Sequence, residues 1–192
     1  MHTLRDTRHT QNVGSNIKKM KIDFSEIENW AEFEDLGPDY FRECKCLDDN
    51  QIITVKVEPT GEGPDGGRDI LVTSLVDDSI VTFERKWVVQ CKFYETLHKS
   101  NLDKINIPTL IREYDACGYL LIAKNSVQVG VTQTFENLRN KCKDGYQYEI
   151  WNGNHFRNKL GFVSNLHQQY FPNYFAYTKE MEARLNTINT SP

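Results

Sequence analysis

A short apolar run, GYLLIAK at residues 118–124, constrains the fold of this chain more than any other feature. A continuous apolar stretch of this length is typical of a strand that is buried on both faces of a sheet. Helical patterns stand on either side of it, from about Leu102 to Ala116 and over residues 129–142. A strand between two helices indicates crossover connections, and such connections join parallel strands.

The segments before this run have the pattern of three antiparallel strands. Residues 51–58 are β-branched and alternate, and the apolar runs 69–76 and 80–94 flank the acidic pair Asp77-Asp78, where we expect a hairpin turn. The remaining expected elements are one strand at 146–152 and helices at 23–46 and 154–168. This order predicts an α/β sandwich, in which a mixed central β-sheet is flanked by helices.

The first expected helix, residues 23–46, carries an interruption. Ser25 and Glu28 have the spacing of a capping box at its start. Its apolar residues recur at helical spacing: Ile27, Trp30, Phe33 and Leu36. Gly37-Pro38 should break or kink the helix, and Asp39–Cys46 is expected to resume as a second short helix.

Length and composition indicate a single soluble domain. The chain has 192 residues, 39% of them hydrophobic and 26% charged, and no apolar run approaches the ~20 residues that span a bilayer. Residues 1–20 are polar, lack the apolar centre of a secretory signal, and are expected to be flexible. The domain is expected over 21–168, followed by an aromatic-rich C-terminal tail or helix at 169–192.

Charge and cysteine content restrict the partners and the compartment. The five cysteines are an odd number without a CxxC pair, which favours reduced thiols and a cytoplasmic protein. The net charge of −4 argues weakly against a sequence-independent DNA-binding protein. It is compatible with a nuclease, because carboxylates that hold a metal ion lower the total charge while a local basic patch persists.

The glycine-rich segment GEGPDGGRDI, residues 61–70, is a second strong signal. A strand follows it and no Lys-Ser/Thr pair is present, which excludes a P-loop and a dinucleotide fingerprint. The acidic ladder of an EF-hand is also missing. A tight loop that feeds a strand explains the glycines, and Asp65 is expected to cap that loop. It does not explain Asp69, a poor β-former at the start of an apolar strand.

The partner strand offers polar residues for Asp69. In WVVQCKFY, Gln90 and Lys92 are two residues apart and therefore point to the same face of the strand. Buried polar side chains need polar partners. A short turn at Asp77-Asp78 would place Asp69 opposite Lys86, so we expect a bulge near residues 84–86 that brings Gln90 and Lys92 beside it.

These residue types suit the hydrolysis of phosphodiester bonds. Mg²⁺ takes oxygen ligands and keeps several waters, with Mn²⁺ as a substitute. Asp69 supplies a carboxylate, Gln90 an amide oxygen and Cys91 its backbone carbonyl. The ammonium group of Lys92 can orient the attacking water or stabilise the charge that develops on the phosphate.

GPDGGRDI, a hairpin and then VVQCKFY resemble, in order and spacing, the Mrr-like branch of the PD-(D/E)XK nuclease superfamily. The resemblance covers about residues 25–165. It implies the restriction-endonuclease fold, with Gln90 as a recognised substitution in a QxK variant of the ExK motif. The family also carries a metal-site glutamate on the leading helix, which Glu34 matches best, with Glu43 as the alternative.

The resemblance implies a metal-dependent endonuclease that cuts DNA, with double-stranded DNA as the expected substrate and restriction or anti-phage defence as its role. Nucleases of this fold often act as dimers, so a homodimer or a larger effector assembly is an expected partner, and a membrane is not. Two alternatives stay open. The first alternative is a catalytically silent module of the same fold that binds nucleic acid or protein. The second is a nuclease specific for RNA or single strands.

Overall fold

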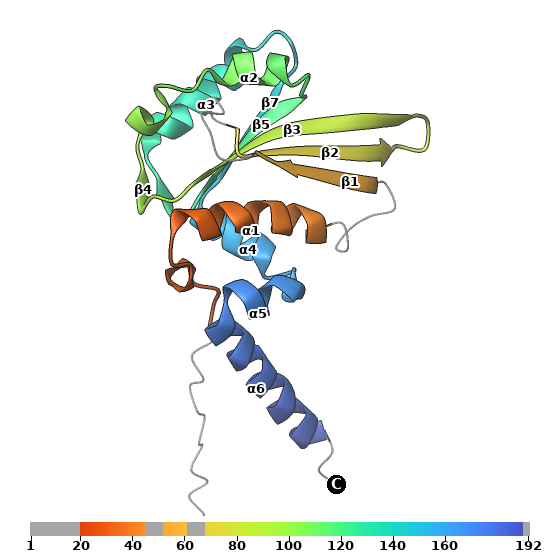
Figure 1. Cartoon of the computed structure of the whole chain (residues 1–192), viewed down its shortest axis with the longest axis vertical. Coiled ribbons are helices and arrows are strands. Elements are labelled where there is room, and N and C mark those ends of the chain that lie inside the picture. The colour runs from red at the N-terminus through yellow and green to blue at the C-terminus, as the bar shows by residue number, and fades with distance from the viewer. Residues whose placement is uncertain (1–19, 45–51, 61–67, 190–192) are drawn as a thin grey trace, which may run out of the picture.

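The structure is a computed structural model that describes residues 20–44, 52–60 and 68–189. Its centre is a five-stranded sheet with the strand order β1-β2-β3-β5-β7 (Figure 1). The strands are β1 (Ile52–Pro59), β2 (Ile70–Asp77), β3 (Thr82–Lys92), β5 (Gly118–Ala123) and β7 (Gln147–Trp151). The first three strands pair antiparallel and the last three pair parallel, so the predicted mixed sheet is confirmed.

Helices cover both faces of this sheet (Figure 1). The described helices are α1 (Trp30–Glu43), α2 (Ile107–Glu113), α3 (Val129–Lys141), α4 (Gly153–Leu160), α5 (His167–Tyr170) and α6 (Pro172–Asn189). Short 3-10 helices are η1 (Phe24–Glu26), η3 (Lys99–Leu102) and η4 (Ser164–Leu166), and β4 (Thr96–Leu97) pairs with β6 (Ser126–Val127). α2 and α3 lie on one face, and α1 and α4 lie on the other.

Two apolar cores result, one on each face of the sheet. Alternate residues of a strand point to opposite faces. Val89, Leu120 and Ile122 therefore join the core under α1, while Tyr119 and Leu121 join the core under α2 and α3. All six residues of β5 are buried, which confirms the expectation from the run GYLLIAK.

The expected break of the first helix is wrong. α1 is one continuous helix that contains Pro38, and it begins at Trp30, where the Asn29 side chain accepts a hydrogen bond from the Glu32 amide, in place of the expected Ser25–Glu28 box. Apolar side chains pack along one side of α1 against the sheet, and this packing offsets the poor helix propensity of Gly37-Pro38.

The hairpin turn is longer than expected. It occupies residues 78–81, because the Asp78 carboxylate accepts hydrogen bonds from the amides of Ile80 (3.0 Å) and Val81 (2.9 Å). Asp77 therefore pairs with Thr82, and Ile70 pairs with Val89. The expected bulge near residues 84–86 is wrong, because β2 pairs with β3 without a register shift over these described residues. The longer turn, and not a bulge, moves Asp69 away from Lys86 and toward the end of β3.

Other expectations were too coarse. The helix expected from Leu102 to Ala116 is shorter, since Asn106 caps α2 and Pro108 stands in its first turn. The helix expected at 154–168 ends at Leu160 and is followed by η4 and α5. In the described part of the chain, no helix is long and apolar enough to cross a membrane. Asp65, Cys46 and most of the glycine-rich segment lie outside the described residues.

An aromatic cluster on the α1 face supplies a test of this packing. Phe156 is fully buried. The centroid of its ring lies 5.5 to 6.1 Å from the ring centroids of four aromatic residues: Phe24, Phe33, Tyr40 and Trp151. Phe156→Ala should lower the free energy of unfolding in urea by about 3–5 kcal/mol, because it opens a cavity in this cluster. Phe162→Ala is the matched control, since Phe162 is 73% exposed, and it should change stability by less than ~0.5 kcal/mol.

Candidate active site

The candidate site lies where β3 continues past the start of β2. β2 begins at Ile70, which pairs with Val89, so the last three residues of β3, Gln90–Lys92, extend beyond it. We call these three residues the β3 overhang. On its other side the overhang remains paired with β5, from Leu121 to Ala123.

Asp69 fills the position next to the overhang. Its backbone amide donates to the Val89 carbonyl (3.0 Å), and its carbonyl accepts from the Thr60 amide (2.8 Å). Its carboxylate accepts a hydrogen bond from the Cys91 amide at 2.5 Å. Two chain segments that are far apart in sequence therefore meet through one charged side chain.

The direction of the backbone groups follows from strand geometry. The Val89 carbonyl points toward β2, and the Lys92 carbonyl accepts from the Lys124 amide on the β5 side. Backbone groups alternate along a strand, so the amide and the carbonyl of Cys91 both point to the β2 side. The Asp69 carboxylate takes the place of the missing β2 residue, and the Cys91 carbonyl faces the same edge.

Gln90 is oriented by a residue that the sequence did not single out. Gln90 is 2% exposed, and its side-chain oxygen accepts a hydrogen bond from the Tyr119 hydroxyl at 2.8 Å. A side-chain amide oxygen has two lone pairs, so this bond leaves one for another partner. The available signal was a tyrosine at the start of an otherwise aliphatic buried strand, because a buried tyrosine hydroxyl needs a partner.

Lys92 ends β3 and is partly buried. It lies on the same face of the strand as Gln90, because the two are separated by one residue. Arg68, immediately before Asp69, is another residue that the sequence did not single out. Its guanidinium lies 4.3 Å from the centre of the Tyr114 ring, which fastens the chain beside Asp69 to the end of α2.

Glu34 approaches the overhang from the opposite face of the sheet. It is partly buried on α1, one turn before Gly37, which lies against Cys91. Burial raises the pKa of the Cys91 thiol well above its usual range, the charges of Asp69 and Glu34 raise it further, and Lys92 lowers it. The two carboxylates and the ammonium group therefore all act on one buried sulfur atom.

Glu43 lies elsewhere. Its carboxylate accepts a hydrogen bond from the Asn165 side chain at 2.8 Å. It follows Glu34 by nine residues in α1, which is about 14 Å along the helix axis. Of the two glutamates, Glu34 is the one whose charge acts on Cys91 in the overhang.

The donor atoms at the overhang fit a hard divalent cation. Asp69 and Glu34 offer carboxylates, Gln90 an amide oxygen and Cys91 a backbone carbonyl, and Mg²⁺ and Mn²⁺ prefer such all-oxygen sets. Within residues 20–44, 52–60 and 68–189, no group of three or more His, Cys, Asp or Glu side chains is placed to hold a metal ion. A site with two carboxylates relies on the other oxygens and on water.

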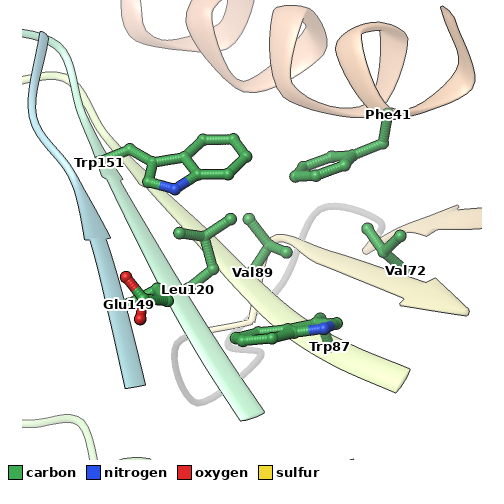
Figure 2. A pocket seen from close by; sticks show the side chains of 7 residues that line it. All are labelled: Phe41, Val72, Trp87, Val89, Leu120, Glu149 and Trp151. Carbon is green, nitrogen blue, oxygen red and sulfur yellow. The ribbon is translucent and has the colours of Figure 1, made fainter. Parts of the chain in front are cut away.

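A cavity of about 170 Å³ on the α1 face is separate from these groups (Figure 2). Phe41 reaches into it from α1, Trp87 and Val89 from β3, and Trp151 from β7. Glu149 is the charged residue in its lining, and neither Asp69 nor the polar residues of the overhang line it. The cavity is therefore an apolar pocket at the border of the core, open beside the exposed Glu149, and it is not the candidate active site.

Comparisons with known proteins assign the chain to a family. Residues 26–156 match the family model described as restriction endonuclease, Mrr_cat. The match covers well over half of the chain and includes Glu34, Asp69 and the β3 overhang. The chain belongs to this family, so its resemblance to the Mrr-like nucleases and the restriction-endonuclease-like fold are both confirmed. The family is one of DNA endonucleases.

Two solved structures are similar at low identity. One is the DNA modification-dependent restriction endonuclease AspBHI, with 16% identity and a TM-score of 0.49 over 79% of this chain and 35% of that chain. The other is the MspJI restriction endonuclease in complex with a 27-mer oligonucleotide, with 14% identity and a TM-score of 0.45 over 75% of this chain and 29% of that one. The chain spans about a third of the length of each. A search of curated proteins gave no match.

The hydrogen bond between Tyr119 and Gln90 can be tested by removing one atom. Tyr119→Phe keeps the ring but leaves the buried Gln90 oxygen without the hydroxyl donor. We expect the free energy of unfolding to fall by about 1–3 kcal/mol in urea titrations. Tyr146→Phe is a control for loss of a tyrosine hydroxyl outside this site. Equal stability of Tyr119→Phe and the parent chain would show that the bond contributes nothing.

Proposed function

We propose that this chain is a divalent-metal-dependent endonuclease that hydrolyses phosphodiester bonds of double-stranded DNA. One observation carries the proposal: the Asp69 carboxylate is held against the end of the strand that bears Gln90 and Lys92. Family membership supports DNA as the substrate. The QxK pattern in this family supports a hydrolytic role for these residues.

Each side chain has a role that follows from its chemistry. Asp69, Gln90 and the Cys91 carbonyl hold the cation, Mg²⁺ or Mn²⁺, and Glu34 adds a carboxylate from the α1 side. When bound, such a cation polarises the phosphoryl oxygen and promotes deprotonation of the attacking water. The buried hydrogen bond from Tyr119 keeps the Gln90 amide in one orientation, which limits the reorganisation needed on binding.

Lys92 supplies positive charge where negative charge develops. An ammonium group can donate hydrogen bonds to the attacking water or to a non-bridging phosphate oxygen. The hydrogen bond to the phosphate favours the transition state over the ground state, since charge on the phosphate oxygens increases during attack. Lys92 lies on the Gln90 face of β3, which is consistent with a position beside the bound phosphate.

The wider role proposed is restriction or anti-phage defence in the cytoplasm, and the family description, restriction endonuclease, supports restriction. A cut through both strands requires two active sites or two successive reactions. We propose the first of these routes, with a second copy of the chain or a larger assembly with further domains as the functional unit.

The cleavage assay tests the proposal most simply. Asp69→Ala and Lys92→Ala should each reduce plasmid cleavage by at least about a thousandfold in Mg²⁺, comparable to the loss of a central group in other active sites. EDTA should abolish cleavage by the parent chain. Lys141→Ala, an exposed lysine near the end of α3, should cleave like the parent.

Other substrates in the same assay separate the alternatives. Binding of duplex DNA without cleavage under Mg²⁺ or Mn²⁺ would favour a catalytically silent module. Cleavage of RNA or single strands, with duplex DNA left intact, would favour the other nuclease class. Either result contradicts the proposed activity.

A second prediction concerns the charge of residue 90. Gln90→Glu keeps an oxygen that can accept from Tyr119 and adds a negative charge that favours a cation, so cleavage should persist at a lower Mg²⁺ requirement. Gln90→Leu removes the oxygen and should behave like Asp69→Ala. Equal activity of Gln90→Leu and the parent in a Mg²⁺ titration would exclude Gln90 as a ligand.

A further inference from the structure

α1 and the sheet are in close contact at Gly37. A Cβ atom added there would lie 2.8 Å from Ile70 Cδ1 and 2.9 Å from Cys91 Sγ. Real Cβ atoms essentially never come this close, since carbon atoms prefer contacts of about 3.5–4.0 Å. Any side chain at position 37 would therefore move α1 away from the sheet by about 1 Å or displace both neighbours.

The two residues that face Gly37, Ile70 and Cys91, belong to the hydrogen-bonded contact between Asp69 and the β3 overhang. Ile70 follows Asp69 directly, and Cys91 donates its amide hydrogen to the Asp69 carboxylate. Gly37 thus lies on the α1 side of the same hydrogen bond. The contact at Gly37 therefore sets the distance between α1 and the sheet, and it does so next to the candidate metal ligands.

Glu34 is carried by the same helix face. It precedes Gly37 by three residues, and residues at this spacing lie on one side of a helix with Cβ atoms about 5–6 Å apart. Because a helix moves as a rigid element, a shift at Gly37 shifts the Glu34 carboxylate by a similar amount. Glycine and proline are the two poorest helix formers, so helix formation does not explain Gly37.

We propose that Gly37 is a positioning residue: its missing side chain lets α1 lie directly on Ile70 and Cys91 and so brings the Glu34 carboxylate to the edge where Asp69 contacts Cys91. The proposal rests on the proposed metal-dependent function and adds to it the residue that sets the distance of Glu34. The alternative is that Gly37 serves only the packing of α1.

Calorimetric measurement of Mn²⁺ binding to the full chain distinguishes a positioning role of Gly37 from a packing role. This measurement does not depend on catalysis. Glu34→Gln and Gly37→Ala should each weaken Mn²⁺ binding by about 10–100-fold, as the loss or displacement of a supporting group does. The double variant should bind no more weakly than the weaker single variant, because both changes act through one carboxylate. Additive effects on the binding free energy, or Mn²⁺ binding by Gly37→Ala equal to that of the parent, would overturn the proposal.

A rescue variant covers the case in which Gly37→Ala fails to fold. Ile70→Val with Cys91→Ala removes the two atoms that the new methyl group would meet. In that background, Gly37→Ala should fold and should bind Mn²⁺ within a few-fold of the background itself. A loss as large as in the parent chain, or failure to fold in this background, contradicts a role through close approach.

Gly130 provides a matched control for the Gly37 substitution, and plasmid cleavage provides a parallel assay. Gly130→Ala, in α3, adds a methyl group with ordinary contacts at 3.6 Å and should leave Mn²⁺ binding unchanged. A loss there equal to that of Gly37→Ala would show a general effect of the substitution and would sink the proposal. Plasmid cleavage by the parent, measured alongside, separates the hypotheses: Mn²⁺ binding without cleavage removes the nuclease function but leaves the positioning role standing.

Discussion

The hydrogen bond from the Cys91 amide to the Asp69 carboxylate is the interaction on which the candidate site depends. It forms because β3 continues past the first residue of β2 and exposes backbone groups that no strand residue pairs on that side. The carboxylate satisfies one of these groups and stays at the sheet edge. An anionic oxygen is thereby fixed at the Cys91 amide, between Gln90 and Lys92 in the sequence, on the part of β3 that is paired with β5.

The two faces of the sheet add different supports to this edge. On the α2 and α3 face, the Tyr119 hydroxyl binds Gln90 in a fully buried contact. On the α1 face, Gly37 lets the helix lie against Cys91 with Glu34 one turn away. A site whose groups are held by packed strands and helices needs little rearrangement on binding, which favours catalysis.

The sequence predicted the strands and the mixed sheet well, because alternation and continuous apolar runs report burial directly. The same-face placement of Gln90 and Lys92 also followed from strand period alone. The register between β2 and β3 could not be predicted, because it depends on two side-chain hydrogen bonds of Asp78 that lengthen the turn. The continuity of α1 through Pro38 and the contact of Tyr119 with Gln90 both arise from packing between distant segments, which local patterns do not contain.

Crystals of the chain grown with Mn²⁺ and a short DNA duplex would reveal where the cation binds, through the anomalous scattering of the metal. We expect a Mn²⁺ ion in direct contact with the Asp69 carboxylate and the Cys91 carbonyl, with Lys92 directed at a phosphate of the duplex. A Mn²⁺ ion bound elsewhere, or a duplex whose phosphates lie far from the β3 overhang, would contradict this expectation.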